Sequence, residues 1–154
     1  MAKVISIGNQ SFESIRKDDC FYIDKTSFIK EWWENKDNVT LITRPRRFGK
    51  TLNMSMLECF FSNKYKDRGD LFEGLEIWND EKYRKLQGTY PVIFLSFAKI
   101  KQNTYEGAVK QIKNELINLM LSAVSEYKTC NITSEKILET ASEIEDETLR
   151  TKLK

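Results

Sequence analysis

The amino-acid sequence predicts an α/β fold, an incomplete three-layer sandwich in which helices flank a small parallel sheet. Two segments carry this prediction. Residues 39–42 form a short apolar and β-branched run, which leads through a basic loop into an amphipathic helical pattern. Residues 92–97 form a nearly continuous apolar run, typical of a strand buried on both faces, and a long helical pattern follows them. Strands that alternate with helices predict a parallel sheet.

The predicted sheet is incomplete because two parallel strands do not make a domain. Either weaker strands lie within residues 1–25 and 71–78, or part of the sheet lies outside this sequence. We expect a truncated domain over residues 1–130 and a charged helical tail over residues 131–154. The tail is distinct in composition, since residues 133–154 hold six acidic and four basic side chains.

The composition indicates a globular chain. Of 154 residues, 40% are hydrophobic and 31% are charged, with a formal net charge of +2. Such a mild charge does not by itself indicate a nucleic-acid-binding protein. No apolar run approaches the roughly 18 residues of a membrane span, and the first residues lack the apolar core of a signal peptide. We therefore expect a cytoplasmic protein with no membrane partner.

The cysteines and the missing histidine narrow the possible chemistry. The three cysteines lie far apart, which suits a reducing compartment and offers no C-x-x-C metal pair: Cys20, Cys59 and Cys130. Histidine is absent, so Ser-His and Cys-His catalysis are excluded. Any chemistry must come from lysine, arginine, carboxylates and hydroxyls, or from a bound metal-nucleotide.

One predicted helix precedes the basic loop in the sequence, and another follows it. Residues 24–27 supply helix-capping side chains, and a helical face follows at Phe28, Ile29, Trp32 and Trp33. After the loop, apolar residues recur at helical spacing until Ser62: Leu52, Met56, Leu57, Phe60 and Phe61. We expect these two apolar faces to lie in the core. We also interpret Asp24 and Thr26 as helix caps and not as ligands.

The later part of the chain predicts two more helices. Asn79 and Asp80 are suited to cap a brief helix through Leu86. Asn103 and Thr104, with Glu106, resemble a capping box, and they predict the start of the longest helix. Its stripe is expected in the core: Tyr105, Ala108, Val109, Ile112, Leu116, Leu119, Met120, Ala123, Val124 and Tyr127.

The basic loop reads Arg-Pro-Arg-Arg-Phe-Gly-Lys-Thr over residues 44–51. An apolar strand, then Gly-Lys-Thr, then a helix is the layout of a phosphate-binding loop (P-loop), in which backbone N–H groups and a helix N-terminus face an anion. Lys50 would reach the outer phosphates and the Thr51 hydroxyl would bind Mg²⁺. The generic pattern G-x-x-x-x-G-K-[ST] fails at its first glycine, where this chain has Arg44.

Other interpretations of this loop remain open. It can be an ordinary basic turn between a strand and a helix, and Pro45 removes one N–H from the usual cradle. Three arginines ahead of a helix N-terminus make an electropositive spot. Polyphosphate would satisfy that charge, and so would an acidic protein surface or nucleic acid bound through Arg44, Arg46 and Arg47.

Five blocks, in this order, resemble one known family. They read F-E-S-I-R, F-Y-I-D-K-T, T-R-P-R-R-F-G-K-T-L-N-M-S-M-L, L-F-E-G-L and Y-P-V-I-F-L-S-F, at residues 12–16, 21–26, 43–57, 71–75 and 90–97. Over roughly residues 5–125 the sequence resembles the N-terminal part of the bacterial AAA-ATPase-like family. These are P-loop proteins that often carry a C-terminal PD-(D/E)XK nuclease-like domain. Arg44 at the glycine position is a hallmark of this family's own loop.

The resemblance implies ATP and Mg²⁺ as ligands. It implies phosphate contacts from Arg47, Phe48, Gly49, Lys50, Thr51 and Leu52, with the metal at Thr51, and it places residues 22–26 near the adenine end. The family's Walker B pair, an apolar strand ending in Asp-Glu, has no match here, because residues 92–97 end in Ser-Phe. No catalytic residue is therefore assigned, and whether the chain is an enzyme stays open.

Two functions compete. The leading hypothesis is a truncated P-loop domain that binds ATP-Mg²⁺ and, lacking Walker B, hydrolyses it little or not at all alone. The alternative is a non-catalytic interaction module that has lost nucleotide binding, for example an inhibitor or decoy acting on a nucleic-acid-handling or defence complex. Surfaces left by the missing half would then bind a partner protein or form a homodimer. A degenerate fragment with no separate role is a third possibility.

Overall fold

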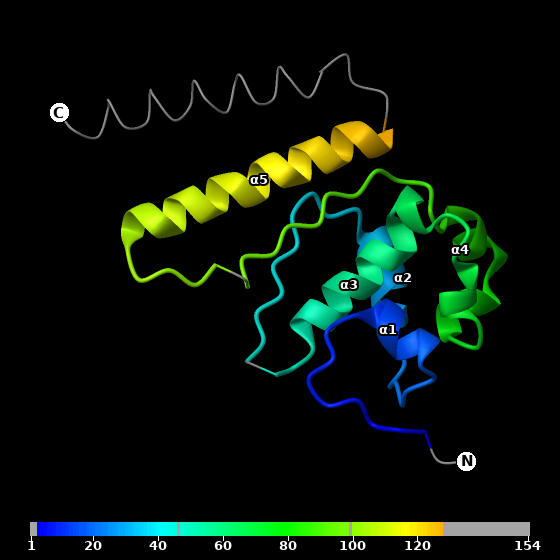
Figure 1. The fold of residues 1–154 in the computed structure, drawn as a ribbon. Coiled ribbons are helices and arrows are strands. Elements are labelled where there is room, and N and C mark those ends of the chain that lie inside the picture. The colour runs from blue at the N-terminus through cyan, green and yellow to red at the C-terminus, as the bar shows by residue number, and fades with distance from the viewer. Residues whose placement is uncertain (1–2, 46, 99, 128–154) are drawn as a thin grey trace. The chain divides into compact units, whose positions relative to one another are not determined.

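The computed structural model describes residues 3–45, 47–98 and 100–127 (Figure 1). Its elements in order are α1 (Phe12–Lys17), α2 (Ser27–Asn35), α3 (Lys50–Phe61), the 3₁₀ turns η1 (Asn63–Tyr65), η2 (Gly69–Phe72) and η3 (Glu76–Asn79), α4 (Glu81–Leu86) and α5 (Tyr105–Tyr127). The chain divides into two compact units, Met1–Val92 and Ile93–Lys154. Each unit is described by itself.

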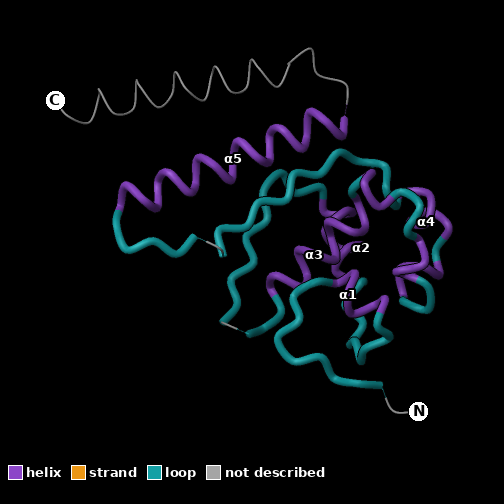
Figure 2. Tube along the Cα trace, viewed as in Figure 1, coloured by secondary structure: helices purple, strands orange, loops and turns teal. Residues whose placement is uncertain are grey.

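The predicted α/β class is wrong for the described part of the chain, which is helical and contains no β-strand (Figure 2). A single isolated parallel bridge joins Ser62 and Tyr90. Both predicted strands, residues 39–42 and 92–97, lie in segments without regular secondary structure, and neither has a ladder of hydrogen bonds to a neighbour. Alternating apolar residues favour an extended chain, yet a strand exists only when a second strand pairs with it.

In Met1–Val92, α2, α3 and α4 form where the sequence predicts helices, whereas α1 was not predicted. Ser11 begins α1, with its side chain accepting a hydrogen bond from the Ser14 N–H at 3.2 Å. Asp80 begins α4 in the same way, accepting from the Lys82 N–H at 2.9 Å. Each cap satisfies an N–H group that the first turn of a helix leaves without a partner.

The core of this unit is rich in aromatic side chains. Phe60, Phe72 and Phe12 are fully buried and their rings meet in pairs, with centroids 5.2 Å apart for Phe60–Phe72 and 5.1 Å apart for Phe12–Phe72. Phe61 is also buried, and Trp32 and Trp33 of α2 pack against it. The predicted core residues of α2 and α3 are thus confirmed. This core fixes the direction of α3, whose N-terminal end follows the basic loop.

Asp24 and Thr26 connect the start of α2 to η3. The Asp24 carboxylate accepts from the Thr26 N–H, the Thr26 hydroxyl and the Glu76 N–H, at 2.8, 2.7 and 2.7 Å. Thr26 is fully buried, and its hydroxyl oxygen accepts from the Ile77 N–H at 3.2 Å. Thr26 stands at the N-cap position of α2 without making a side-chain cap. These two side chains therefore form a tertiary link, where the sequence had predicted local caps.

Burial by itself would raise the pKa of the Asp24 carboxyl. The hydrogen bonds from the Glu76 N–H, the Thr26 N–H and the Thr26 hydroxyl outweigh burial, and they hold this pKa below its usual value. The link is therefore strongest when Asp24 is ionised.

In Ile93–Lys154 the described structure is dominated by α5. Its start is as predicted, because the Thr104 hydroxyl accepts from the Gly107 N–H at 3.1 Å. Its apolar stripe is not a buried core, since the exposed fractions are 66% for Tyr105, 39% for Leu116 and 57% for Met120. Helical periodicity shows which residues share a face, but it does not supply the element that would cover the face.

The predicted boundary between residues 130 and 131 and the tail over residues 131–154 lie outside the described residues, so that division stays a prediction. Among the helices that are described, none combines the length and the apolar character needed to cross a membrane.

Candidate functional site

The basic loop ends on a glycine that begins α3. Gly49 is the N-cap of this helix and has a left-handed backbone, with φ 73° and ψ 20°. No side chain caps α3, because glycine has none to offer. The N–H groups of the first helical turn therefore have no intrahelical partner, and they carry the positive end of the helix dipole. An uncapped helix start of this kind is suited to an anion.

A second residue with a left-handed backbone lies two positions earlier, and this one is strained. Arg47 has φ 69°, a left-handed conformation that a residue with a side chain rarely adopts. Left-handed residues in a short loop turn consecutive N–H groups towards one side, as in the backbone nests that bind anions. The strain costs roughly 1–3 kcal/mol, which the surrounding structure has to offset.

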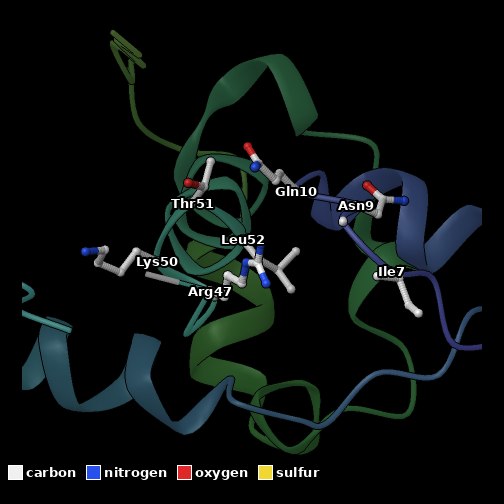
Figure 3. Close-up of a pocket in the computed structure, with 9 residues that line it drawn as sticks. Ile7, Asn9, Gln10, Arg47, Lys50, Thr51 and Leu52 are labelled. Carbon is white, nitrogen blue, oxygen red and sulfur yellow. The ribbon is translucent and has the colours of Figure 1, made fainter. Parts of the chain in front are cut away.

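The start of α3 opens onto a cavity of about 820 Å³. Five of the six residues predicted to bind the cofactor line it: Arg47, Gly49, Lys50, Thr51 and Leu52. The rest of its lining comes from the N-terminal segment: Ile7, Gly8, Asn9 and Gln10. Figure 3 shows the two groups on different sides of the view, with Lys50 and Thr51 on one side and Ile7 and Asn9 on the other. The volume is within the usual range for small-molecule sites, about 300–1,000 Å³.

The N-terminal wall is held against α3 by hydrogen bonds. The Phe12 N–H donates to the Ser55 hydroxyl of α3 at 3.1 Å, a contact between residues 43 positions apart. Asn9 accepts from the Ser11 N–H at 3.0 Å and donates to the Ser14 hydroxyl at 3.1 Å. Gly8 turns the chain with φ 83°. The wall is thus a turn that leads directly into α1.

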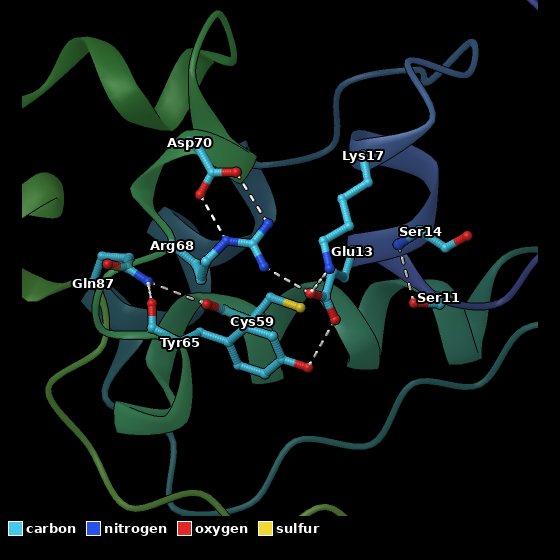
Figure 4. A network of polar contacts seen from close by, with 9 residues as sticks. All are labelled: Ser11, Glu13, Ser14, Lys17, Cys59, Tyr65, Arg68, Asp70 and Gln87. Atoms are coloured by element: carbon cyan, nitrogen blue, oxygen red, sulfur yellow. Dashed lines mark hydrogen bonds and ion pairs between the residues drawn. The ribbon is translucent and has the colours of Figure 1, made fainter.

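Ion pairs hold α1 from its other side (Figure 4). Glu13 accepts from Lys17 at 2.7 Å and from Arg68 at 2.8 Å, and Arg68 also contacts Asp70 at 2.9 Å. The hydrogen bond from Lys17, together with those from Arg68, keeps the pKa of Glu13 below its usual value despite some burial. This network links α1 to η2 and so supports the N-terminal wall.

Lys50 lies across its own loop. Its ammonium donates to the Arg44 carbonyl at 2.6 Å. Figure 3 shows its side chain directed away from Ile7 and Asn9. The bond is to a backbone oxygen and not to a carboxylate, so the positive charge of Lys50 is not neutralised within the described structure.

Phe48 departs from the predicted set. Its side chain is 57% exposed, and it lines a smaller cavity of about 280 Å³ instead of the larger one. That smaller cavity also includes Arg44 of the loop and Lys25 at the start of α2. Arg46, the third arginine of the predicted nucleic-acid contact, is outside the described residues.

Thr51 is the predicted metal ligand, and it lies on the larger cavity. No carboxylate lines this cavity, and the described residues contain no group of three or more metal-binding side chains. A single hydroxyl suits Mg²⁺ bound through a nucleotide, because Mg²⁺ keeps several waters and takes its other ligands from phosphates. The lining therefore fits a metal that arrives with its nucleotide.

Most of the block predicted near the adenine end has a structural role. The Tyr22 hydroxyl donates to the Met56 sulfur at 3.2 Å, and its ring meets Phe12 edge-on. Burial raises the pKa of Tyr22 to about 12. With Asp24 and Thr26 linked to η3, Lys25 is the member of the block whose charged group approaches the loop.

Sequence reasoning missed Ile7, Gly8, Asn9 and Gln10. A local signal did exist, because Gly8 and Asn9 form a turn pair and Ser11 is a capping residue. That signal predicts a turn, but it does not show that the turn faces a loop about forty residues away.

The sequence matches a family model described as "Predicted AAA-ATPase" over residues 6–153. A protein of Azotobacter chroococcum mcd 1, described as "Uncharacterized protein in vnfD 5'region", is 37% identical over 97 residues. That alignment covers 62% of this chain and 17% of the relative, so the chain spans only a small part of the relative's length. No solved structure matches the sequence.

Proposed function

The chain belongs to the Predicted AAA-ATPase family, and on that premise we propose that it binds Mg-ATP where α3 begins. The observation that carries the proposal is the uncapped N-terminus of α3, which opens onto a cavity large enough for a nucleotide. Neither the motif nor the cavity alone would suffice. Gly-Lys-Thr is a common tripeptide, and cavities of this size are common on protein surfaces.

The phosphates would bind at the α3 wall. The first-turn N–H groups, after Gly49, provide hydrogen bonds and the helix dipole provides a favourable potential. Lys50 would exchange its bond to the Arg44 carbonyl for one to a phosphate oxygen, since an ammonium binds an anion more strongly than a neutral carbonyl. Arg47 lines the same cavity and adds a second positive charge.

Thr51 would hold the Mg²⁺ that accompanies the nucleotide. The bound metal supplies charge neutralisation between the phosphate oxygens. In this arrangement the chain contributes one hydroxyl, and water and phosphate complete the coordination.

The nucleoside would extend towards the N-terminal wall. Ile7 and Leu52 give apolar surface to the cavity, and Gln10 offers an amide with both a donor and acceptor. Nucleotide sites commonly combine apolar surface with a few polar groups of this kind. The nucleotide thus spans both walls of the cavity.

We expect little or no hydrolysis by this chain alone. Phosphoryl transfer to water requires a side chain that positions the attacking water. The described residues that line the cavity include no aspartate or glutamate for that task. Lys50 and Arg47 stabilise negative charge, which favours binding but does not orient a nucleophile.

Isothermal titration calorimetry with Mg-ATP tests the binding proposal. We compare the wild type with Lys50→Ala and with Lys30→Ala, which removes the same charge from an exposed position of α2. We expect the wild type and Lys30→Ala to bind alike, and Lys50→Ala to lose roughly tenfold or more in affinity. Equal binding by all three proteins, or binding by none, would refute the proposal.

Hydrolysis is tested separately, by phosphate release with protein in excess over ATP. We expect the wild type to release phosphate no faster than the Lys50→Ala variant does. Turnover that depends on Lys50 would show that a water-positioning group exists and that this part of the proposal is wrong.

The second candidate, an interaction module, is favoured by one observation. The segment before the loop exposes apolar side chains, with 87% of Val39 and 83% of Leu41 accessible. Contiguous exposed apolar surface often marks a protein interface. Sedimentation velocity across a concentration series tests self-association. A dimer weakened by Leu41→Ser would support this function, and a monomer at every concentration would argue against a homodimer.

A further inference from the structure

Lys25 brings a third cation to the start of α3. Its ammonium nitrogen lies 4.0 Å from the position that a Cβ atom would occupy on Gly49. Gly49 is the cap of the helix on which the phosphates are proposed to rest. Lys25 comes from the start of α2, so this approach is tertiary and is not part of the loop motif.

The backbone on both sides of Lys25 is fixed. Asp24 accepts three hydrogen bonds and Thr26 is fully buried, which links both residues to η3. The Lys25 side chain itself is exposed. The Cα of Lys25 is thus positioned by the folded core, while its ammonium lies in an exposed position near Gly49.

The charge of Lys25 is not neutralised within the described structure. The ion pairs there engage Lys3, Lys17, Arg68, Lys82 and Lys85. Lys25 shares the smaller cavity with two carboxylates, Asp24 and Glu31, and with Arg44. Asp24 is occupied by its hydrogen bonds to Thr26 and Glu76, and Glu31 forms no ion pair with Lys25.

We propose that Lys25 is a phosphate-binding residue of the nucleotide site and increases its affinity for polyphosphate chains. The inference rests on the proposed function. A polyphosphate carries several negative charges, which Lys50, Arg47 and the helix dipole balance only in part. An ammonium that approaches the helix cap from the segment before α2 adds a contact to the anion that the residues of the loop do not provide.

Calorimetry with two probes tests this proposal: Mg-ATP and inorganic tripolyphosphate. In Lys25→Gln, the affinity for both falls by roughly tenfold, because one charge-assisted hydrogen bond is lost at the phosphates. Lys25→Arg keeps the charge and retains most of the affinity. Lys30→Gln, the matched control at an exposed position within α2, binds both probes like the wild type.

Three outcomes would overturn the proposal. These are an unchanged affinity in Lys25→Gln, an equal loss in Lys30→Gln, or a loss for ATP without a loss for tripolyphosphate. The melting temperature without ligand should be the same for Lys25→Gln and wild type, since the side chain is exposed. If the wild type binds ATP and needs Lys50 but not Lys25, only this inference fails. If the wild type binds no ATP, the proposed function fails with it.

Discussion

The two walls of the cavity are built in different ways. The α3 wall comes from one short stretch of chain, Arg47 and residues 49–52, and its geometry is set locally by a left-handed Gly49 and the start of a helix. The N-terminal wall, residues 7–10, is held in place by contacts with distant residues, such as that from the Phe12 N–H to Ser55. One wall can therefore be recognised as a motif, whereas the other exists only in the folded unit.

The two walls also suit different parts of a nucleotide. The α3 wall offers N–H groups and cations, which suit phosphate. The N-terminal wall offers Ile7, Asn9 and Gln10, which suit a nucleoside. Substitutions in the α3 wall should therefore affect every phosphate ligand. Those in the N-terminal wall should affect ATP but not inorganic tripolyphosphate.

The largest effect is expected from Gly49→Ala. Its φ of 73° is unfavourable for alanine, so the substitution destabilises the fold by roughly 1–2 kcal/mol or moves the loop. Either result disturbs the N–H groups that would face the phosphates. We expect binding of both Mg-ATP and tripolyphosphate to be lost, as measured by calorimetry.

Gly8→Ala is the matched control in the other wall. Gly8 has φ 83°, and a Cβ there would meet no atom within 4 Å, so the folding cost is similar. Tripolyphosphate binding should survive in this variant. If the two alanine variants lose tripolyphosphate affinity equally, the walls do not divide the ligand as proposed.

Ser55→Ala is expected to have the next largest effect. It removes the acceptor of the Phe12 N–H, which loosens the N-terminal wall at a cost of about 1 kcal/mol in the free energy of unfolding. For a chain of this size the melting temperature should fall by roughly 2–4 °C. Mg-ATP should bind several-fold more weakly and tripolyphosphate as in the wild type. A loss of affinity for both ligands would mean that Ser55 supports the α3 wall instead.

The same contrast explains what could be predicted from the sequence. The positions of α2, α3 and α4, the core faces of α2 and α3, and the P-loop motif depend on patterns within about a dozen neighbouring residues. Asp80 capped α4 as predicted because a cap needs only the residue two positions ahead. Lys25 and Gln10 could not be assigned to the site in this way, because their approach to it depends on tertiary contacts.

The prediction of an α/β fold was wrong for the same reason, because a sheet depends on contacts between distant segments. Residues 39–42 and 92–97 have the composition of strands, but both lie outside regular secondary structure. Composition describes the backbone that a segment prefers, but a sheet requires a partner for every N–H and C=O group along it. Among the described residues no backbone ladder pairs with residues 39–42, and the side chains of Val39 and Leu41 are exposed.

Acidification is expected to lower the stability of the fold by a smaller amount, because it weakens the link from Asp24 to η3 that positions Lys25. Because the pKa of Asp24 is lowered in the folded chain, its contribution to stability is present above the usual pKa of 3.8 and is lost as pH falls through the folded value. Asp24→Asn should therefore melt below the wild type at pH 7, and the gap should narrow at pH 3. A gap that is the same at both pH values would show that the carboxylate charge does not matter.

The smallest effect is expected from Gln10→Ala, and it bears most directly on the N-terminal wall. Gln10 is exposed, so removing its amide should leave the melting temperature unchanged. If the amide contacts the base, the substitution costs one hydrogen bond to a neutral group, roughly 1 kcal/mol or about fivefold in ATP affinity. The affinities for ATP and GTP should then become more alike, because an amide distinguishes bases by the order of donors and acceptors at their edges. Tripolyphosphate affinity serves as the internal control. An unchanged ratio of ATP to GTP affinity, with full tripolyphosphate binding, would place the base elsewhere and leave only the α3 wall as the binding site.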